Sequence, residues 1–260
     1  MNAAFHYTFL RTEKKYLLTL PVFEGFFEQI KPNIQPDEYG RSTICNIYCD
    51  TEHYDLISRS IDGPDYKEKL RLRSYGVPGP KDTVFLELKK KYRGTVFKRR
   101  ISLPLEEAEG YLEEGIPPRE RGQIFREIDY FCHFYHPLPR LFLAYDREAF
   151  VCREDPSIRL TFDKNIRSRT DHLHLSDGDQ GRIYLQEAYR LMELKVPGAF
   201  PMWLVRALSR WKIYPTSFSK YGSIYKQELA PAGLTAGREK AVGMHSYSEQ
   251  GRNAACLQVY

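Results

Sequence analysis

Charged and apolar residues alternate along several stretches of the chain. In residues 69–73 (KLRLR) three cations lie on one face of a β-strand and two leucines on the other, because strand side chains alternate between faces. The same pattern recurs in four further stretches, which are 86–91, 97–101, 158–163 and 192–196. One such face would be an ordinary solvated surface, whereas five of them indicate a shared charged surface that holds a polyanion.

The hydrophobic pattern predicts eight strands, separated by turns and short helices. We expect strands over 8–16, 43–50, 66–75, 83–91, 94–103, 139–152, 157–164 and 189–196. Apolar residues at helical spacing predict helices over 21–30, 105–115, 119–134 and 201–211. A polar, Asp- and Gly-rich stretch predicts a loop over 170–186. One domain is expected over 1–229, followed by a largely disordered tail over 230–260 that has no periodicity.

These elements indicate an α+β domain that is built on an antiparallel sheet. The helices carry apolar stripes that need a sheet to cover, and the apolar faces of the strands can supply it. We therefore expect a closed eight-stranded antiparallel β-barrel with peripheral helices outside and a charged lumen inside. A lumen lined by Arg and Lys must hold water and anions, because a dry cationic interior is costly.

Composition narrows the possible classes of protein. The 260 residues carry a formal net charge of +5, which permits an acidic partner without demanding one. No apolar run approaches the roughly 20 residues that span a bilayer, and the N-terminal residues do not resemble a secretory signal, so we expect no membrane insertion. The five cysteines lack metal-binding spacing, and their odd number favours reduced thiols in the cytoplasm. Nucleic-acid binding is not expected, because cations inside a narrow lumen cannot follow a duplex.

Seven short motifs, in order, resemble the VTC domain. They are RTEKKY at 11–16, NIYCDT at 46–51, KLRLRSYG at 69–76, FLELK at 85–89, RLTFD at 159–163, MELK at 192–195 and SFSKY at 217–221. The resemblance covers roughly residues 8–225. The VTC domain is the polyphosphate polymerase module of the vacuolar transporter chaperone complex, and it belongs to the CYTH-like triphosphate tunnel metalloenzymes.

The resemblance implies a tunnel enzyme that transfers the γ-phosphate of ATP to a growing polyphosphate chain, assisted by Mn²⁺ or Mg²⁺. One motif departs from the superfamily. Its triphosphatase branch opens with an ExExK signature, whereas this chain has Arg11, Glu13 and Lys15 at those positions. A cation at position 11 replaces a metal-binding carboxylate, which weakens a hydrolase interpretation and favours a polymerase.

Phosphoryl transfer needs in-line positioning and compensation of the charge on the transferred group. Arg presents forked donors to phosphate oxygens, and Lys presents a compact point charge. We predict a central phosphate clamp of four residues, which are Arg71, Arg73, Lys89 and Arg159. Further cations are predicted to bind substrate along the lumen, namely Lys15, Lys69, Arg147, Lys195 and Lys220. Weaker candidates are Lys91, Lys98 and Arg100.

The resemblance places the family's metal-binding carboxylate at Glu193. Glu87 is a second candidate ligand, with the alternative that it orients Lys89 or Arg73. Mg²⁺ and Mn²⁺ suit such a site, since they prefer oxygen ligands from carboxylates and substrate phosphates. No arrangement of residues suggests a covalent enzyme intermediate, so we expect direct transfer to the acceptor phosphate.

Two other functions stay open at this stage. One is a tunnel triphosphatase that hydrolyses inorganic triphosphate or nucleoside triphosphates. The other is a non-catalytic module that binds polyphosphate or inositol phosphates. The expected ligands are ATP and polyphosphate, and docking to a separate membrane subunit is possible. The sequence does not predict the oligomeric state.

Overall fold

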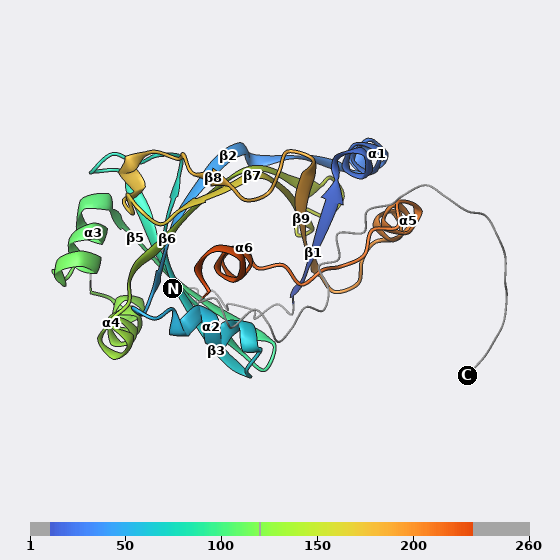
Figure 1. Ribbon diagram of the computed structural model, residues 1–260. Coiled ribbons are helices and arrows are strands. Elements are labelled where there is room, and N and C mark those ends of the chain that lie inside the picture. The colour runs from blue at the N-terminus through green and yellow to red at the C-terminus, as the bar shows by residue number, and fades with distance from the viewer. Residues whose placement is uncertain (1–10, 120, 231–260) are drawn as a thin grey trace, which may run out of the picture.

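The computed structural model describes residues 11–119 and 121–230. Figure 1 shows a strongly curved sheet with helices on its outer side and one short helix, α6, within its concave side. The predicted tail lies outside the described residues from position 231 onward. No helix in the described ranges combines the length and the apolar character that crossing a bilayer requires.

Eight long antiparallel strands form the sheet, in the order β1-β9-β7-β6-β2-β3-β4-β5, and a short β8 pairs with β7. Their bounds are β1 Arg11–Thr19, β2 Ile34–Asp50, β3 Tyr66–Tyr75, β4 Thr83–Tyr92, β5 Thr95–Pro104, β6 Leu138–Cys152, β7 Arg159–Arg169, β8 Arg182–Ile183 and β9 Tyr189–Pro197. The predicted antiparallel α+β fold is confirmed, and each of the eight predicted strands has a counterpart. The largest difference is β2, which begins nine residues earlier than predicted.

Of the six α-helices within the described residues, four were predicted, with small shifts at their ends. The helices are α1 Leu20–Ile30, α2 Asp55–Asp62, α3 Leu105–Glu114, α4 Gln123–Tyr135, α5 Met202–Arg210 and α6 Lys220–Ile224. A π-helical turn over Tyr225–Leu229 follows α6, and 3₁₀ turns lie at Lys31–Asn33 and Leu175–Asp177. The short helices α2 and α6 were not predicted. The predicted loop over 170–186 contains a 3₁₀ turn and β8.

The prediction of a closed barrel was wrong. Strands β1 and β5 are the two ends of the strand order, and no ladder joins them in the part of the chain that the structure describes. The segment after α5 uses the edge of β1 instead, because the backbone N–H of Thr216 donates to the carbonyl of Lys15 at 2.7 Å. The chain therefore reaches α6 along the edge that barrel closure would have used.

The outer face of the sheet is apolar, as the alternation predicts. Leucines of β3 and β4, such as Leu70 and Leu88, pack with residues of α3 and α4, including Phe131. On the other side of the molecule, Phe162 of β7 packs with Phe26 of α1 and with residues of α5. Burying each such side chain contributes about 1.5–3 kcal/mol. These two clusters hold the helices on the outside of the curved sheet.

A third apolar cluster lies on the concave side, where only charged residues were expected. Tyr221 and Ile224 of α6 pack against Leu143 and Tyr145 of β6 and against Tyr48 of β2. The rings of Tyr221 and Tyr48 stack with their centroids 4.7 Å apart. Helix α6 thus covers an apolar part of the concave face, and the charged residues occupy the remainder.

Candidate functional site: a cationic concave surface

Antiparallel register brings the predicted site residues onto the concave face of the sheet. Within β3, residues 69, 71 and 73 share a face opposite to Leu70 and Leu72, which are fully buried on the outer side. We call the contribution of β3, β4 and β5 the cation-rich wall, which consists of Lys69, Arg71, Arg73, Glu87, Lys89, Lys98 and Arg100. We call the contribution of β1, β6, β7, β9 and α6 the balanced wall, which consists of Glu13, Lys15, Arg147, Arg159, Asp163, Glu193, Lys195 and Lys220.

Glu87 is the centre of the cation-rich wall. Its side chain is 1% exposed. One of its oxygens accepts from Arg71 Nε at 2.8 Å, and the other accepts from Arg100 Nε at 2.7 Å and lies 2.6 Å from Lys98 Nζ. Arg73 Nε lies 3.9 Å away. Burial by itself raises the pKa of Glu87, but these cations outweigh it and hold the pKa far below its usual range. Glu87 therefore orients cations, which favours that alternative over the role of a metal ligand.

Neutral side chains hold the two clamp arginines of β3. Arg73 Nε donates to Asn46 Oδ1 at 2.9 Å, and Arg71 Nη1 donates to the hydroxyl of Tyr48 at 3.2 Å. Arg73 Nη2 lies 3.4 Å from the hydroxyl of Tyr145. Burial raises the pKa of Tyr48, yet the two guanidinium groups dominate and lower it to about 8. The guanidinium planes are thus fixed before any ligand arrives, which is what positioning of a phosphate requires.

Three lysines form a row across the cation-rich wall. Lys69 of β3 is paired in register with Lys89 of β4, and Lys89 with Lys98 of β5. Burial is the main cause that lowers the pKa of Lys69, to about 8, and neighbouring lysines add to it. The pKa of Lys89 and that of Lys98 are also lowered by loss of solvent around the charge, although Lys89 stays accessible to water. An anion bound along this row would relieve the repulsion.

Asp163 organises one part of the balanced wall. It is fully buried and accepts two hydrogen bonds from Arg147, at 2.7 and 2.9 Å, and one from Lys220 at 2.6 Å. Lys220 also lies 4.2 Å from the centroid of the Tyr145 ring. Burial raises the pKa of Asp163, but Lys220 and Arg147 lower it by more. Asp163 therefore ties helix α6 to the sheet through Lys220.

Glu193 lies in the other part of the balanced wall. Its carboxylate is 2.5 Å from Lys195 Nζ, and Lys15 is its cross-strand neighbour on β1. Burial raises the pKa of Glu193, whereas Lys195, Lys15 and Arg147 together bring it well below its usual range. The charges of Glu193 and Glu13 both raise the pKa of Lys89, which belongs to the cation-rich wall. The two walls therefore face each other across the concave surface.

The residues around Glu193 fit a divalent metal that is held partly by substrate. Among residues 11–119 and 121–230, no group of three or more His, Cys, Asp or Glu side chains could hold a metal by itself. Mg²⁺ commonly binds through one or two carboxylates together with substrate phosphates. Glu193, with Glu13 on the neighbouring strand, offers carboxylate oxygens of that kind beside the cations that would hold the phosphates.

Two predicted site residues have partners outside these clusters. Arg159 Nη2 donates to Asp37 Oδ2 at 2.8 Å, and its side chain stays 42% exposed. Lys15 Nζ donates to the carbonyl of Phe218 at 3.1 Å. Arg159 thus belongs to the edge of the concave surface, whereas Lys15 is joined to the segment that leads into α6.

The sequence interpretation did not assign several residues that position the cations. They are Asp37, Asn46, Tyr48, Tyr145, Asp163 and Ser219, the last of which accepts from Lys69 Nζ at 3.3 Å. Alternation with Arg159 does place Asp163 on the charged face, so that residue had a usable signal. The partners in β2 and near α6 had none, because alternation does not reveal which strands and helices become neighbours.

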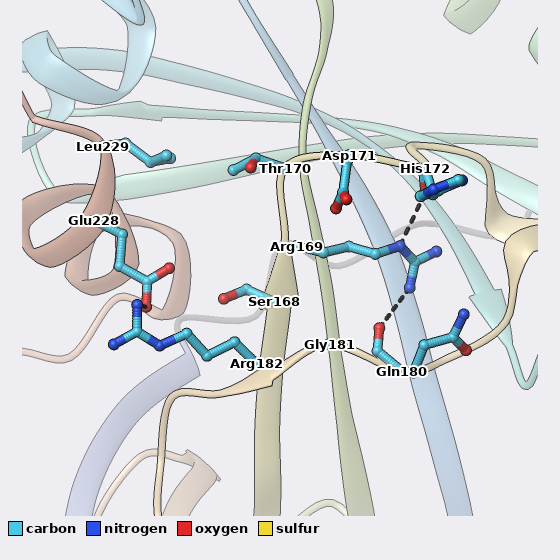
Figure 2. A pocket seen from close by; sticks show the side chains of 10 residues that line it. All are labelled: Ser168, Arg169, Thr170, Asp171, His172, Gln180, Gly181, Arg182, Glu228 and Leu229. Carbon is cyan, nitrogen blue, oxygen red and sulfur yellow. Dashed lines mark hydrogen bonds and ion pairs between the residues drawn. The ribbon is translucent and has the colours of Figure 1, made fainter.

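A separate pocket of about 540 Å³ lies away from the two walls (Figure 2). It is lined by residues at the end of β7, by the following loop and β8, and by Glu228 and Leu229. Arg169 is prominent in it, but its guanidinium donates to the carbonyls of His172, His174, Gly178 and Gln180. Arg169 therefore fixes the loop over 170–180 and is not available as a phosphate ligand.

The fold and the cationic concave surface define a member of the triphosphate tunnel class. Two solved structures share the fold. One is a putative adenylate cyclase from Bacillus halodurans, with a TM-score of 0.51 and 16% identity, over 80% of this chain and 92% of that one. The other is a putative adenylyl cyclase from Hippeastrum, described as having a dominant triphosphatase activity, with a TM-score of 0.54 and 15% identity, over 85% and 98% of the two chains.

Within that class, the chain belongs to the VTC domain family, whose model matches residues 10–228. It is 26% identical over 188 residues to subunit 4 of the vacuolar transporter chaperone complex of Trypanosoma brucei brucei. That match covers 61% of this chain and 24% of the relative, so the chain spans about a quarter of the relative's length. The resemblance inferred from the seven motifs is confirmed.

Proposed function

We propose that this protein is a metal-dependent polyphosphate polymerase that transfers the γ-phosphate of ATP to a polyphosphate chain bound on the concave surface. The observation that carries the proposal is the cation-rich wall, in which six cations lie beside one carboxylate, Glu87, which pairs with four of them, namely Arg71, Arg73, Lys98 and Arg100. A surface with more cations than carboxylates can bind a polyanion. A surface that binds no anion would instead pair its cations with its own carboxylates, because unpaired charge is costly. Membership of the VTC domain family supports the same substrate class.

The proposal gives individual residues the following roles. Arg71 and Arg73 are held by Glu87 and Asn46, so their free N–H groups bind the phosphate oxygens that gain charge during transfer. Lys69 and Lys89 extend the binding surface for the acceptor chain. Arg159 binds at the edge, while Lys15, Arg147, Lys195 and Lys220 contact the substrate from the balanced wall.

Mn²⁺ or Mg²⁺ would be held by Glu193, with Glu87 excluded by its own cations and Glu13 as the neighbouring carboxylate. When bound, such a metal neutralises phosphate charge and holds the transferred group in line. The protein contributes position and charge, and the acceptor phosphate attacks directly.

The test is to incubate the purified protein with ATP and Mn²⁺ or Mg²⁺ and to resolve the products by gel electrophoresis and ³¹P NMR. We expect long-chain polyphosphate and ADP, with formation reduced at least about 100-fold in Arg71→Ala and in Glu193→Ala. Arg206→Ala is the matched control, because Arg206 is exposed on α5 at the outer side of the sheet.

Other products would contradict the proposal in distinct ways. Orthophosphate without chains would identify a tunnel triphosphatase, the activity named for the Hippeastrum protein of the same fold. Tight binding of polyphosphate without turnover would identify a binding module. Three expectations stay predictions. They are the cytoplasmic location, the reduced state of the protein's own cysteines and docking to a separate membrane subunit.

A further inference from the structure

Two aromatic rings stand exposed at the edge of the cationic surface. Tyr39 and Tyr75 have ring centroids 6.4 Å apart and planes inclined by 16°, and they are 62% and 50% exposed. Tyr130 and Phe134 of α4 form a similar exposed pair, so the position of the Tyr39 and Tyr75 rings beside cations is what distinguishes them. The same region carries Arg100 and Arg159, which connects the pair to the phosphate-binding residues.

A local irregularity of β2 presents Tyr39. The pairing of β2 with β6 shifts between Pro36 and Arg41, where the strand bulges. Asp37 Oδ1 accepts from the backbone N–H groups of Tyr39 and Gly40, both at 2.9 Å, and Gly40 has a φ of +52°. The other oxygen of Asp37 accepts from Arg159 at 2.8 Å. The turn that holds Tyr39 is therefore bonded to a residue of the predicted phosphate clamp.

Tyr75 is joined to the opposite side of the same surface. It is two residues beyond Arg73 on β3 and so lies on the charged face. Arg100 Nη2 lies 3.5 Å from the hydroxyl of Tyr75, and Arg100 Nε donates to Glu87. The Tyr75 ring also meets the edge of Phe85, over which Arg100 is stacked at 4.0 Å. One chain of contacts thus runs from the exposed ring to the centre of the cation-rich wall.

Polyphosphate gives no reason for such a pair, because it has no aromatic or apolar surface. A nucleoside triphosphate does, since its base stacks on aromatic rings while its phosphates extend toward cations. We propose that Tyr39 and Tyr75 form the stacking site for the base of the nucleoside triphosphate. This inference rests on the proposed function. It adds the residues that distinguish a nucleotide from an inorganic polyphosphate.

The test compares two ligands that differ by the nucleoside. A non-hydrolysable ATP analogue and inorganic tripolyphosphate are titrated by calorimetry into the wild-type protein and into the double variant Tyr39→Leu/Tyr75→Leu. Stacking of a base on aromatic side chains predicts a loss of affinity for the ATP analogue of about tenfold or more. Affinity for tripolyphosphate should stay within about twofold, because it does not reach the rings.

Two further variants separate stacking from other effects. Tyr39→Phe/Tyr75→Phe keeps both rings and removes the hydroxyl beside Arg100, so it should bind the ATP analogue as the wild type does. Tyr130→Leu removes an aromatic ring that is 72% exposed on α4 and should change neither affinity. Circular dichroism of each variant checks that it is folded.

Several results would overturn the inference. Equal losses for both ligands would show that the rings only shape the cationic surface, and an unchanged affinity for the ATP analogue would show that the base binds elsewhere. In either case tripolyphosphate binding by the wild type would leave the proposed function standing. A wild-type protein that binds neither ligand would contradict both proposals.

Discussion

The two walls of the concave surface contain similar residue types but balance their charges differently. In the cation-rich wall, six cations lie beside one carboxylate, Glu87, which pairs with Arg71, Arg73, Lys98 and Arg100. In the balanced wall, three carboxylates accompany five cations, with Asp163 paired to Arg147 and Lys220 and Glu193 to Lys195, while Arg159 pairs with Asp37 of β2. The two walls face each other across the concave surface, where Lys89 of the cation-rich wall is close enough to Glu13 and Glu193 for their charges to affect its pKa.

This difference separates two tasks of a phosphate site. A wall with excess cations has donors left over for a polyanion, and its repulsion falls when the polyanion binds. A wall with paired charges gains less from an anion, but its carboxylates are already ionised and can hold a metal. The proposed function therefore assigns phosphate binding and metal binding to opposite sides of the concave surface.

Replacing the one carboxylate of the cation-rich wall should have the largest effect. Glu87→Gln removes a buried charge that several cations share, and its one amide oxygen leaves at least two of Arg71, Arg100 and Lys98 without a partner, which costs about 3–5 kcal/mol in free energy of unfolding. Saturating tripolyphosphate should raise the melting temperature of this variant by more than that of the wild type, because the anion replaces the missing carboxylate. Urea denaturation and thermal melts with and without ligand measure both effects.

The matched control is Glu127→Gln on α4, which also removes a carboxylate paired with an arginine, Arg99 at 2.9 Å, but on the outer side of the sheet. This variant should lose less than about 1 kcal/mol and respond to tripolyphosphate as the wild type does. If Glu87→Gln behaved like the control, the cation-rich wall would not be held by its carboxylate.

A smaller effect is expected in the balanced wall. Asp163→Asn weakens the bonds to Arg147 and Lys220, but its amide oxygen still accepts one of them, so the free energy of unfolding should fall by about 2–3 kcal/mol. Since Lys220 begins α6, amide hydrogen exchange should quicken in residues 220–224 more than in β3. A loss of protection in β3 equal to that in α6 would show that the two walls are not independent.

The smallest effect is a pH dependence that belongs to the cation-rich wall. The pKa of Lys69 is lowered to about 8 in the folded protein, so the side chain loses its charge as the pH rises through that value. Affinity for tripolyphosphate should therefore decline between pH 7 and pH 9, by up to about tenfold per pH unit for one proton. The pKa values of Lys89 and Lys98 are also lowered, so these lysines lose their charge at a lower pH than a solvated lysine does.

Lys69→Arg provides the comparison, because a guanidinium stays charged throughout this range. The decline should be shallower in that variant, while the titration of the ligand itself is the same for both proteins. Calorimetric titration of tripolyphosphate into both proteins at five pH values measures the decline in affinity. Parallel curves for the two proteins would show that the charge of Lys69 does not contribute to binding.

Alternation along single strands was enough to predict most of the fold and of the site. It separates Leu70 and Leu72 from their charged neighbours, and the structure places the two leucines under the outer helices. The same reasoning places Arg71, Glu87 and Glu193 on one concave face. These predictions depend only on the two-residue period of a strand, which is local.

The predictions that failed needed information about distant neighbours. Closure of the barrel depends on whether β1 meets β5, and Thr216 occupies the edge of β1 instead. Helix α6 has five residues, too few for a recognisable period, and its place follows from the contact of Tyr221 with Asp50 at 2.9 Å. Of the two partners suggested for Glu87, Arg73 lies 3.9 Å from its carboxylate, but Arg71, Arg100 and Lys98 lie closer and had not been named.

The bond between Lys15 and the carbonyl of Phe218 joins residues 203 positions apart in the chain. Contacts between such distant residues form late in folding, because the intervening chain must be ordered first. During synthesis, the balanced wall cannot be completed until residues 218–220 have left the ribosome, when nearly all of the sheet has already been made. A nascent or truncated chain therefore lacks a finished balanced wall, although the strands of the cation-rich wall have already been made.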